Sequence, residues 1–334
     1  LVINDGQVSG VKIQDTTSDE CFELNAPVVI NATGAWADKL RNQLNPEKRV
    51  RPLRGSHLVL PKAKLPVADA IALFHPVDKR GVFIFPWEGC TVIGTTDVDH
   101  SDDLDIEASI TAQEINYLLE VIKVSFPHSE IVSNDAISTW AGVRPVIGSE
   151  NAKDPSKERR DHAVWDDNGL VTVSGGKLTT FRIIALDALA AATNKLPVYE
   201  PSANDRVFDQ LDDNITLPTS VESKRVKRLL GRYGNLTGEV FVDDNDTEHR
   251  TLSNSEYCLA ECRWAIKYEA VIHLDDLMLR RTRLGSVLVN AGEELFAQLQ
   301  PLFAQELGWD QQRWDDELAR YVAIWQNYYS IPKG

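Results

Sequence analysis

The sequence predicts a mixed α/β fold: an α/β frame, an antiparallel sheet inserted into it, and an all-helical domain after it. Two apolar strands, at 27–30 and 170–173, each run into a turn of small residues and then a helical pattern, as in an α/β frame. From 51 to 97 several strands follow one another through short turns without a helix, which is typical of an antiparallel sheet. After residue 218 the apolar spacing is helical.

Composition and charge narrow the class of protein. The 334 residues are 43% hydrophobic and 25% charged, which is typical of a soluble globular chain with about two domains. The net charge of −15 disfavours a nucleic-acid partner, because phosphate backbones attract basic proteins. Four cysteines show neither zinc spacing nor a disulfide framework. No apolar run reaches the roughly 20 residues of a membrane-spanning helix, so we expect any membrane contact to be peripheral.

The chain opens on a β-hairpin and a strand–turn–helix unit. Residues 1–13 alternate around an Asp5-Gly6 turn, with no lead-in and no initiating methionine, which resembles the middle of a longer protein. The strand at 27–30 leads into Ala32-Thr33-Gly34 and an amphipathic segment. This turn can bring bare backbone close to a dinucleotide, or it can be an ordinary turn of any α/β protein.

The middle of the chain carries a histidine and an acidic run. His57 stands at the entry of a strand, where a structural histidine is the alternative to a catalytic one. The run 97–103 resembles a calcium loop, but its sixth position is Asp102 and its twelfth is Ala108, where glycine and glutamate are required. We therefore predict no metal site. Thr111 and Glu114 predict a capping box at the start of a helix that Pro127 ends.

Two basic segments could bind an anion. Arg144 lies in the apolar strand 140–146, so it either pairs with a buried carboxylate or holds an anionic ligand; Arg160, in the polar loop that follows, is by default a solvated charge. At 170–182 a strand ends, Gly175 and Gly176 turn the chain, and a helix begins near Thr179. The helix amides and Lys177 form an anion site, unless the segment is a plain glycine turn with a solvated lysine.

The last third of the chain is predicted to be helical. Residues 195–218 contain three prolines and are typical of a linker. Helices are then expected at 219–233, at 255–283 with a break near His273, at 291–307 closed by Gly308, and at 310–329.

Six segments, in their order and separation, carry a family resemblance. They are Asn-Ala-Thr-Gly-Ala-Trp-Ala-Asp at 31–38, Arg-Gly-Ser-His at 54–57, Ile-Gly-Thr-Thr-Asp at 93–97, Gly-Val-Arg-Pro at 142–145, Gly-Gly-Lys-Leu-Thr-Thr at 175–180 and Arg-Arg-Thr-Arg-Leu-Gly at 280–285. Together they resemble the FAD-dependent, quinone-linked glycerol-3-phosphate dehydrogenases over nearly the whole chain. The family's Gly-x-Gly-x-x-Gly loop has no counterpart here, so the chain resembles roughly the C-terminal two thirds of such an enzyme.

The resemblance implies a domain plan and a set of site residues. Residues 1–50 and 166–198 would belong to a Rossmann-type FAD-binding domain, 51–165 to a substrate-binding sheet, 199–218 to a linker and 219–334 to the helical domain. Cofactor contacts would come from Gly34, Gly175, Gly176, Lys177, Leu178 and Thr179. The substrate phosphate would be held by Arg144, Arg160 and Lys177, and His57 would lie near the substrate hydroxyl, with His57, Arg144 and Lys177 as the catalytic group.

The implied reaction is oxidation of sn-glycerol 3-phosphate to dihydroxyacetone phosphate, with hydride passing to FAD and electrons passing on to a membrane quinone. The implied location is the cytoplasm, peripheral on the cytoplasmic membrane, and a homodimer stays open. The helix expected at 219–233 carries the densest basic stretch, namely Lys224, Arg225, Lys227, Arg228 and Arg232, which would suit anionic lipid or a merely solvated face.

Two other functions stay open. One is a different flavin oxidase that acts on an amino or hydroxy acid. The other is an inactive fragment or interaction module that lacks the pyrophosphate loop.

Overall fold

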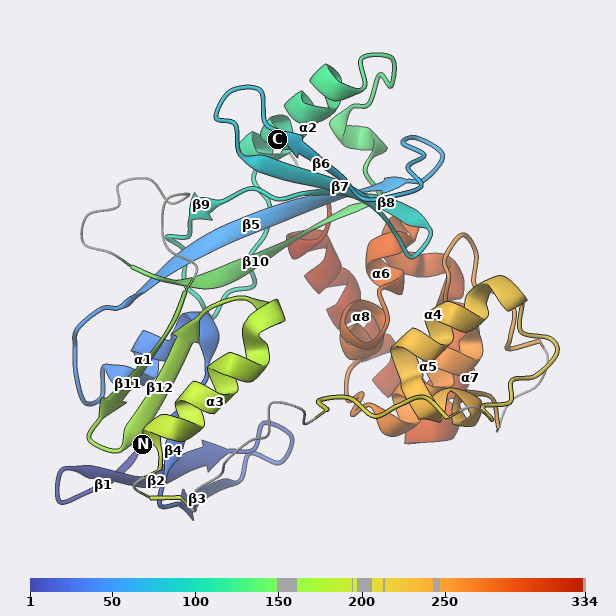
Figure 1. Ribbon diagram of the computed structural model, residues 1–334. Coiled ribbons are helices and arrows are strands. Elements are labelled where there is room, and N and C mark those ends of the chain that lie inside the picture. The colour runs from blue at the N-terminus through green and yellow to red at the C-terminus, as the bar shows by residue number, and fades with distance from the viewer. Residues whose placement is uncertain (149–160, 194, 197–205, 213, 243–246, 333–334) are drawn as a thin grey trace. The chain divides into compact units, whose positions relative to one another are not determined.

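A computed structural model of the chain describes residues 1–148, 161–193, 195–196, 206–212, 214–242 and 247–332 (Figure 1). The chain divides into two compact units. The first consists of Leu1–Gly55, Asp97–Ala108 and Gly142–Asp205, and the second of Ser56–Thr96, Ser109–Ala141 and Arg206–Gly334. Two long strands, β5 (Val50–Pro61) and β10 (Ser138–Ile147), contribute residues to both.

The first unit begins with the predicted hairpin. Strands β1 (Val2–Asn4) and β2 (Gln7–Gln14) pair antiparallel, and β3 (Cys21–Asn25) pairs with the other edge of β2. Asp5 and Gly6 at the turn both have positive φ, as the tight hairpin turn favoured by an Asp-Gly pair requires. The hairpin is therefore confirmed.

Two strand–turn–helix segments form the α/β part of the first unit. Strand β12 (Leu170–Gly175) pairs parallel with β4 (Val29–Asn31) and antiparallel with β11 (His162–Asp167). After β4 come the 3-10 turn η1 (Gly34–Trp36) and helix α1 (Ala37–Arg41), and after β12 come η4 (Leu178–Thr180) and α3 (Phe181–Ala191). Figure 1 shows α3 running alongside β12. Both predicted segments are confirmed.

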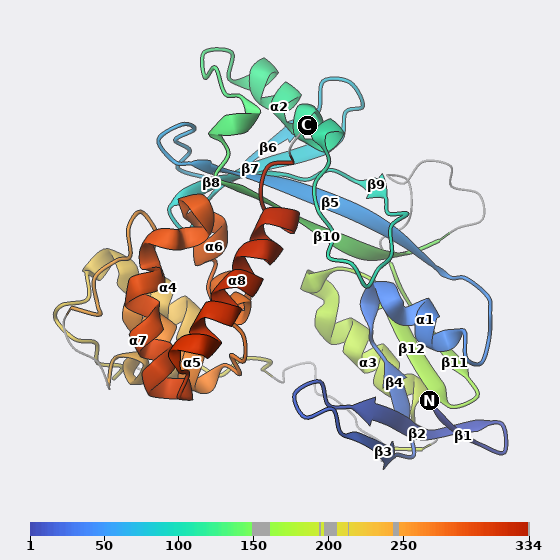
Figure 2. The same cartoon turned by 180° about the vertical axis from the view of Figure 1, so that it is seen from behind.

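An antiparallel sheet with strand order β10-β5-β8-β7-β6 is the inserted element. Its other strands are β6 (Ile71–Phe74), β7 (Gly81–Trp87) and β8 (Cys90–Gly94), and the short β9 (Val98–Asp99) pairs with the N-terminal half of β5. Helix α2 (Ala112–Ser125) starts at the predicted capping box and covers one face of the sheet (Figures 1 and 2). The turn η2 (Ser133–Asp135) then leads into β10.

The C-terminal segment is helical, as predicted. Its elements are α4 (Ser223–Tyr233), η5 (Gly234–Phe241), α5 (Leu259–Tyr268), the π-helix η6 (Asp276–Arg281), α6 (Leu284–Val287), η7 (Val289–Leu295), α7 (Phe296–Leu307) and α8 (Gln311–Tyr328). The gap between α5 and η6 contains the predicted break at His273. Gly308 ends α7 in the left-handed conformation, as predicted, whereas α4 begins four residues later than expected.

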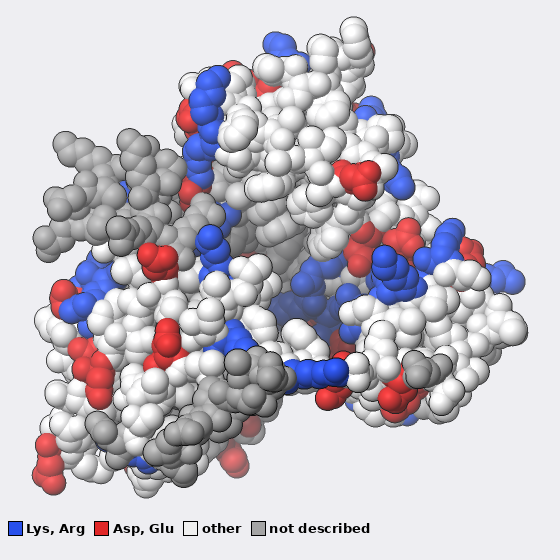
Figure 3. Space-filling model, viewed as in Figure 1, with Lys and Arg blue, Asp and Glu red and all other residues white. Residues whose placement is uncertain are grey.

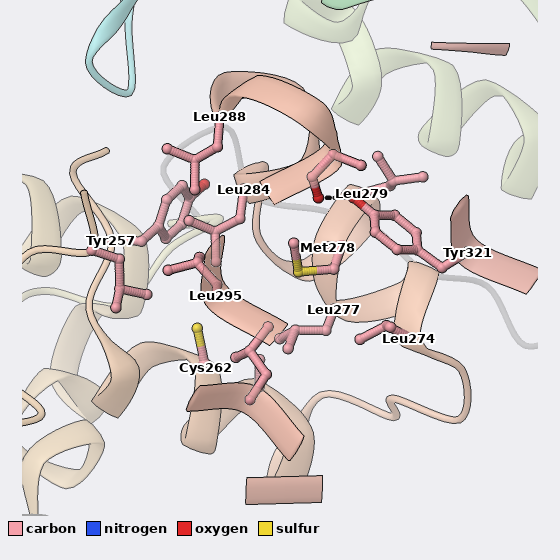
Figure 4. Close-up of a cluster of buried hydrophobic side chains, with 14 of the residues drawn as sticks. Tyr257, Cys262, Leu274, Leu277, Met278, Leu279, Leu284, Leu288, Leu295 and Tyr321 are labelled. Carbon is pink, nitrogen blue, oxygen red and sulfur yellow. Dashed lines mark hydrogen bonds between the residues drawn. The ribbon is translucent and has the colours of Figure 1, made fainter. Parts of the chain in front are cut away.

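The C-terminal helices pack on the second face of the sheet. Val59, Cys90 and Val92 of the sheet belong to the same buried cluster as the helical leucines. Figure 4 shows the centre of this cluster, where Met278 and Cys262 point toward leucine side chains and the Tyr321 hydroxyl donates to the Ala291 carbonyl at 2.6 Å. We name this cluster the helical core. The domain boundaries expected from the sequence stay a prediction.

A buried carboxylate organises α4 against α5. Glu261 accepts from Arg228 Nη1 at 2.8 Å, from Arg225 Nη2 at 3.4 Å and from the Tyr233 hydroxyl at 3.1 Å. Glu261 and Arg225 are essentially inaccessible to solvent, and Arg228 also pairs with Glu88 at 2.8 Å. The prediction of a five-residue basic surface on α4 is therefore wrong for Arg225 and Arg228, because internal carboxylates hold both.

Among the described helices, none combines the length and the apolarity that crossing a lipid bilayer would require.

Candidate functional site

The two small-residue turns of the first unit lie at one edge of its sheet. Strands β4 and β12 run parallel, with Thr172 opposite Asn31. Gly34 follows the carboxyl end of β4, Gly175 is the last residue of β12, and Gly176 follows it. Ligands of α/β proteins bind outside the carboxyl ends of such strands. The structure thus brings the predicted cofactor turns together at the edge where a ligand is expected.

Asn31 holds the first turn in place. Its side chain is buried, donates to the Ala37 carbonyl at 3.0 Å and to Thr172 Oγ1 at 3.2 Å, and accepts from the Thr33 hydroxyl at 2.7 Å. These bonds connect the turn before α1 to strand β12. Asn31 was part of the sequence motif, but an asparagine at a strand end gave no signal of this role.

The second turn requires glycine at both positions. Gly175 and Gly176 each have a φ of +82°, which side chains rarely adopt. A Cβ on Gly175 would lie 2.6 Å from the Asp161 carbonyl oxygen, and one on Gly176 would lie 2.5 Å from Ile184 Cδ1. The turn therefore leads the chain tightly from β12 into the helix.

Lys177, Leu178 and Thr179 follow this turn and are exposed. Within the described residues, the buried hydroxyl of Ser174 has no hydrogen-bond partner. The start of η4 presents main-chain amides, which carry positive partial charge. This donor set fits the electron-rich edge of a flavin ring, since amides and a nearby cation stabilise the negative charge that forms there on reduction.

Arg144 lies on β10 in the first unit. A Cβ on Gly55 would come within 2.1 Å of Arg144 Nη2, so the guanidinium lies directly over the Gly55 main chain. Its Nη1 donates to Asp97 Oδ1 at 3.4 Å; the Asp97 side chain is 2% exposed and that of Arg144 is 31% exposed. The buried-carboxylate alternative is thus confirmed. The remaining exposure leaves the guanidinium accessible to an anion as well, so the ligand alternative stays a prediction.

Strand β10 also reaches the second glycine turn. Ile147, three residues after Arg144, has its Cγ1 atom 2.9 Å from the position that a Cβ on Gly175 would take. The strand that carries Arg144 therefore packs against the predicted cofactor turn. Arg160, the second predicted phosphate ligand, lies outside the described residues.

The acidic run after β8 forms ion pairs with arginines. Asp97 pairs with Arg144, Asp99 with Arg51 at 2.6 Å, and Asp102 with Arg54 at 3.4 Å. The hydrogen bond from Arg51 holds the pKa of Asp99 below its ordinary value. No group of three or more His, Cys, Asp or Glu in the described part of the chain is placed to hold a metal ion.

His57 lies on β5 in the second unit, opposite Gly94 of β8, and its ring stacks on Trp140 of β10. Its neighbour Ser56 donates its hydroxyl to Glu114 Oε1 at 2.8 Å, and Thr96 donates to the same oxygen at 2.7 Å. The capping-box glutamate, which is buried, therefore also holds Ser56, the neighbour of His57, and Thr96, which follows β8. The sequence indicated only its role in the cap.

The side chains of the Arg-Arg-Thr-Arg segment at 280–283 form hydrogen bonds around the end of the π-helix η6. The hydroxyl of Thr282 donates to the Leu277 carbonyl at 2.6 Å, and Arg283 Nη1 donates to the Leu279 carbonyl at 2.9 Å. Arg281 donates to the Glu269 carbonyl. Thr282 and Arg283 thus satisfy carbonyl groups that the π-helix leaves at its end, and Arg281 satisfies the carbonyl of the residue that follows α5.

Two family models and several known proteins match this chain. The family model described as FAD dependent oxidoreductase matches residues 1–182, and the model described as C-terminal domain of alpha-glycerophosphate oxidase matches 191–314. A glycerol-3-phosphate dehydrogenase of Mycobacterium leprae is 31% identical over 335 residues, covering 95% of this chain and 56% of that protein. An aerobic glycerol-3-phosphate dehydrogenase of Staphylococcus haemolyticus is 29% identical over 310 residues, covering 86% of this chain and 55% of that protein.

Among solved structures, the glycerol-3-phosphate dehydrogenase of Bacillus halodurans, crystallised with FAD, shares the fold, with a TM-score of 0.72 and 24% identity over 97% of this chain and 67% of that one. The chain spans about 56% of the length of its curated relative from M. leprae, somewhat less than the two thirds expected from the sequence. The chain belongs to the FAD-dependent oxidoreductases and, within them, to the glycerol-3-phosphate dehydrogenase family.

Proposed function

We propose that this chain takes part in the FAD-dependent oxidation of sn-glycerol 3-phosphate to dihydroxyacetone phosphate. Arg144 is the observation that carries the proposal, because a buried aspartate fixes its guanidinium over the Gly55 main chain while part of it remains exposed. A planar guanidinium suits bidentate binding of phosphate. The names of the relatives and of the second family model support the same substrate.

The substrate phosphate would be held by Arg144, Arg160 and Lys177. The exposure of Lys177 supports its part in this site. Arg160 is proposed on the family resemblance alone. Lys177 at the start of η4 and Arg144 on β10 would hold the phosphate from two elements. C2 of the substrate would remain available for oxidation.

The cofactor would be held at the two turns, by Gly34 and by Gly175, Gly176, Lys177, Leu178 and Thr179. FAD, when bound, accepts the hydride that leaves C2. His57 would take the proton of the C2 hydroxyl, since histidine is the side chain used most often as a general base.

The proposal is tested by an assay with a soluble electron acceptor at saturating FAD. Reduction of the acceptor is expected with glycerol 3-phosphate, and dihydroxyacetone phosphate should form in the same amount. Amino acids and 2-hydroxy acids serve as alternative substrates, since a different flavin oxidase would respond to them. If FAD binds and no substrate is oxidised, the chain is an interaction module or an inactive fragment.

Cofactor retention is the first prediction. No Gly-x-Gly-x-x-Gly loop occurs in the 334 residues, so the pyrophosphate of FAD would lack its usual cradle. We expect the purified chain to lose visible flavin absorbance during gel filtration and to regain it in excess FAD. Stoichiometric flavin in the eluted protein would contradict weak binding.

A second prediction concerns His57. Replacement of His57 with asparagine is expected to lower the rate of glycerol 3-phosphate oxidation by about 10²- to 10⁴-fold, the usual contribution of general base catalysis. His128, which is exposed in the same unit, provides a control when it is changed to asparagine. An unchanged rate and pH profile in the His57 variant would make His57 a structural residue.

The electron acceptor is proposed to be a membrane quinone, reached from the cytoplasmic side by a peripheral contact. Helix α4 retains exposed Lys224, Lys227 and Arg232, and Lys224 also pairs with Glu222. Figure 3 shows acidic and basic side chains interspersed over the C-terminal helical part on the face drawn. This mixture predicts weak membrane attraction at most.

Vesicle flotation gives the third prediction. Each exposed basic residue would contribute about 1 kcal/mol near an anionic surface. We expect weak binding to anionic vesicles at low salt, lost at high salt and lost when Lys224 and Lys227 are changed to glutamine. Arg225 and Arg228 should not be changed, because they pair with internal carboxylates. Binding that survives these substitutions would place the membrane contact elsewhere.

A further inference from the structure

The ring of His57 lies against residues of both neighbouring strands. On one face the indole of Trp140 stacks against it, with ring centroids 3.6 Å apart and an interplanar angle of 10°. Gly94 lies on β8, the strand on the other side of β5 from β10, and a Cβ on it would come within 2.0 Å of His57 Cδ2 and 2.6 Å of Nε2. Only a glycine permits this approach. The plane of the imidazole is therefore set by two neighbours, and all three residues belong to the second unit.

Trp140 is itself held by the helical segment. It packs against the helical core. The residues before it on β10 are anchored there, because Ser138 Oγ donates to the Ser286 carbonyl at 2.5 Å and the Thr139 amide donates to the Tyr329 carbonyl at 2.7 Å. A continuous path of contacts thus runs from the C-terminal helices through Trp140 to His57.

Stability alone does not account for a tryptophan at this position. The indole Nε1 is buried, and within the described residues it has no acceptor. A buried donor without a partner costs about 1–3 kcal/mol, and a phenylalanine would avoid that cost. The indole does offer the most favourable aromatic face for a cation, and an imidazole becomes a cation when it takes up a proton.

We propose that Trp140 is a positioning residue for His57, and that the C-terminal helices act on the reaction through it. The inference rests on the proposed role of His57 as acceptor of the C2 hydroxyl proton. Trp140 and Gly94 hold the imidazole in one plane, so its nitrogen atoms meet the hydroxyl group in a fixed orientation. The indole face also stabilises the imidazolium that forms as the O–H bond breaks and the proton binds to the ring nitrogen.

The contact can be observed without cofactor or substrate. Labelling the chain with [13Cε1]-histidine gives one resonance for each of the seven histidines. The aromatic ring current of Trp140 should move the His57 resonance upfield, and the change of His57 to asparagine should remove that resonance and so assign it. Trp140→Leu should return the resonance to the ordinary range, and Trp140→Phe should leave it shifted. If no histidine resonance responds to Trp140→Leu, the proposal is overturned.

Kinetics then separate positioning from packing. At saturating FAD, Trp140→Leu is expected to lower kcat for glycerol 3-phosphate by about 10²-fold, the usual effect of a misplaced reacting group, with little change in KM. Trp140→Phe should lose about two- to fivefold, because phenylalanine has a weaker cation–π face, yet it should be at least as stable as the wild type. A purely structural role would lower kcat only together with stability, so it would not give a variant that is slower and yet as stable as the wild type.

Trp87→Leu provides the matched control. Trp87 also packs against the helical core, but lies on β7 rather than beside His57. The control should lose thermal stability and keep the wild-type kcat. Equal losses of kcat in Trp87→Leu and Trp140→Leu would overturn the proposal. If the wild type does not oxidise glycerol 3-phosphate at all, the proposed function fails, whereas the resonance experiment still decides whether Trp140 holds His57.

Discussion

Replacement of Arg144 with alanine is expected to raise the KM for glycerol 3-phosphate by about 10- to 150-fold, because a charge-assisted contact contributes about 1.5–3 kcal/mol. The guanidinium is fixed before substrate binds, since Asp97 accepts from it and the Gly55 main chain lies beneath it. Binding of the phosphate therefore costs little conformational entropy in the Arg144 side chain. We expect the rise in KM to lie toward the upper end of this range for that reason. Steady-state kinetics at saturating FAD measure it.

Glycerol, which has no phosphate, is the internal comparison for this variant. Its KM should change little in Arg144→Ala, since the contact that is removed does not exist with glycerol. Arg49→Ala is a matched control, because Arg49 lies in the same unit and pairs with Glu47. An equal loss with both substrates would make Arg144 a structural residue that acts through pairs such as that with Asp97.

Replacement of Glu261 with alanine is expected to lower the free energy of unfolding by about 3–5 kcal/mol, the typical cost of leaving a buried partner charge uncompensated. Arg225 and Arg228 both donate to Glu261, and Arg225 has almost no exposure. Without the carboxylate, the Arg225 guanidinium would stay buried, and among the described residues it would keep the His249 carbonyl, at 2.6 Å, as its acceptor. Urea unfolding followed by far-UV circular dichroism measures the change.

Glu239, which is exposed on the neighbouring η5, is the control for this substitution. Glu239→Ala should change the unfolding free energy by no more than about 0.5 kcal/mol, as surface substitutions usually do. A loss in Glu261→Ala as small as that in Glu239→Ala would mean that the buried charges find other partners.

Local signals in the sequence predicted local structure well. The Asp5-Gly6 turn, the Thr111–Glu114 capping box and the left-handed Gly308 each involve residues within four positions of one another, and the structure has all three. The two strand–turn–helix segments were also correct. Their pairing as parallel neighbours depends on contacts between residues about 140 positions apart. Spacing alone could not establish that pairing.

Contacts between distant residues explain where the sequence interpretation was incomplete. Arg225 and Arg228 were expected at the surface, because a basic helix face is usually solvated, but Glu261 and Glu88 lie opposite them. The acidic run at 97–103 departs from a calcium loop in its sequence, but nothing local indicated that its aspartates pair with arginines. Trp140 stacks on His57 across 83 positions of sequence, and no motif connects the two.

Anaerobic reduction of bound flavin tests the central claim most directly. The chain is saturated with FAD, and glycerol 3-phosphate is added without any electron acceptor while the visible flavin absorbance is recorded. We expect loss of the absorbance with glycerol 3-phosphate, a much slower loss with glycerol, and one dihydroxyacetone phosphate formed for each flavin reduced. Bound flavin that stays oxidised with glycerol 3-phosphate, but is reduced by an amino acid or a 2-hydroxy acid, would contradict it.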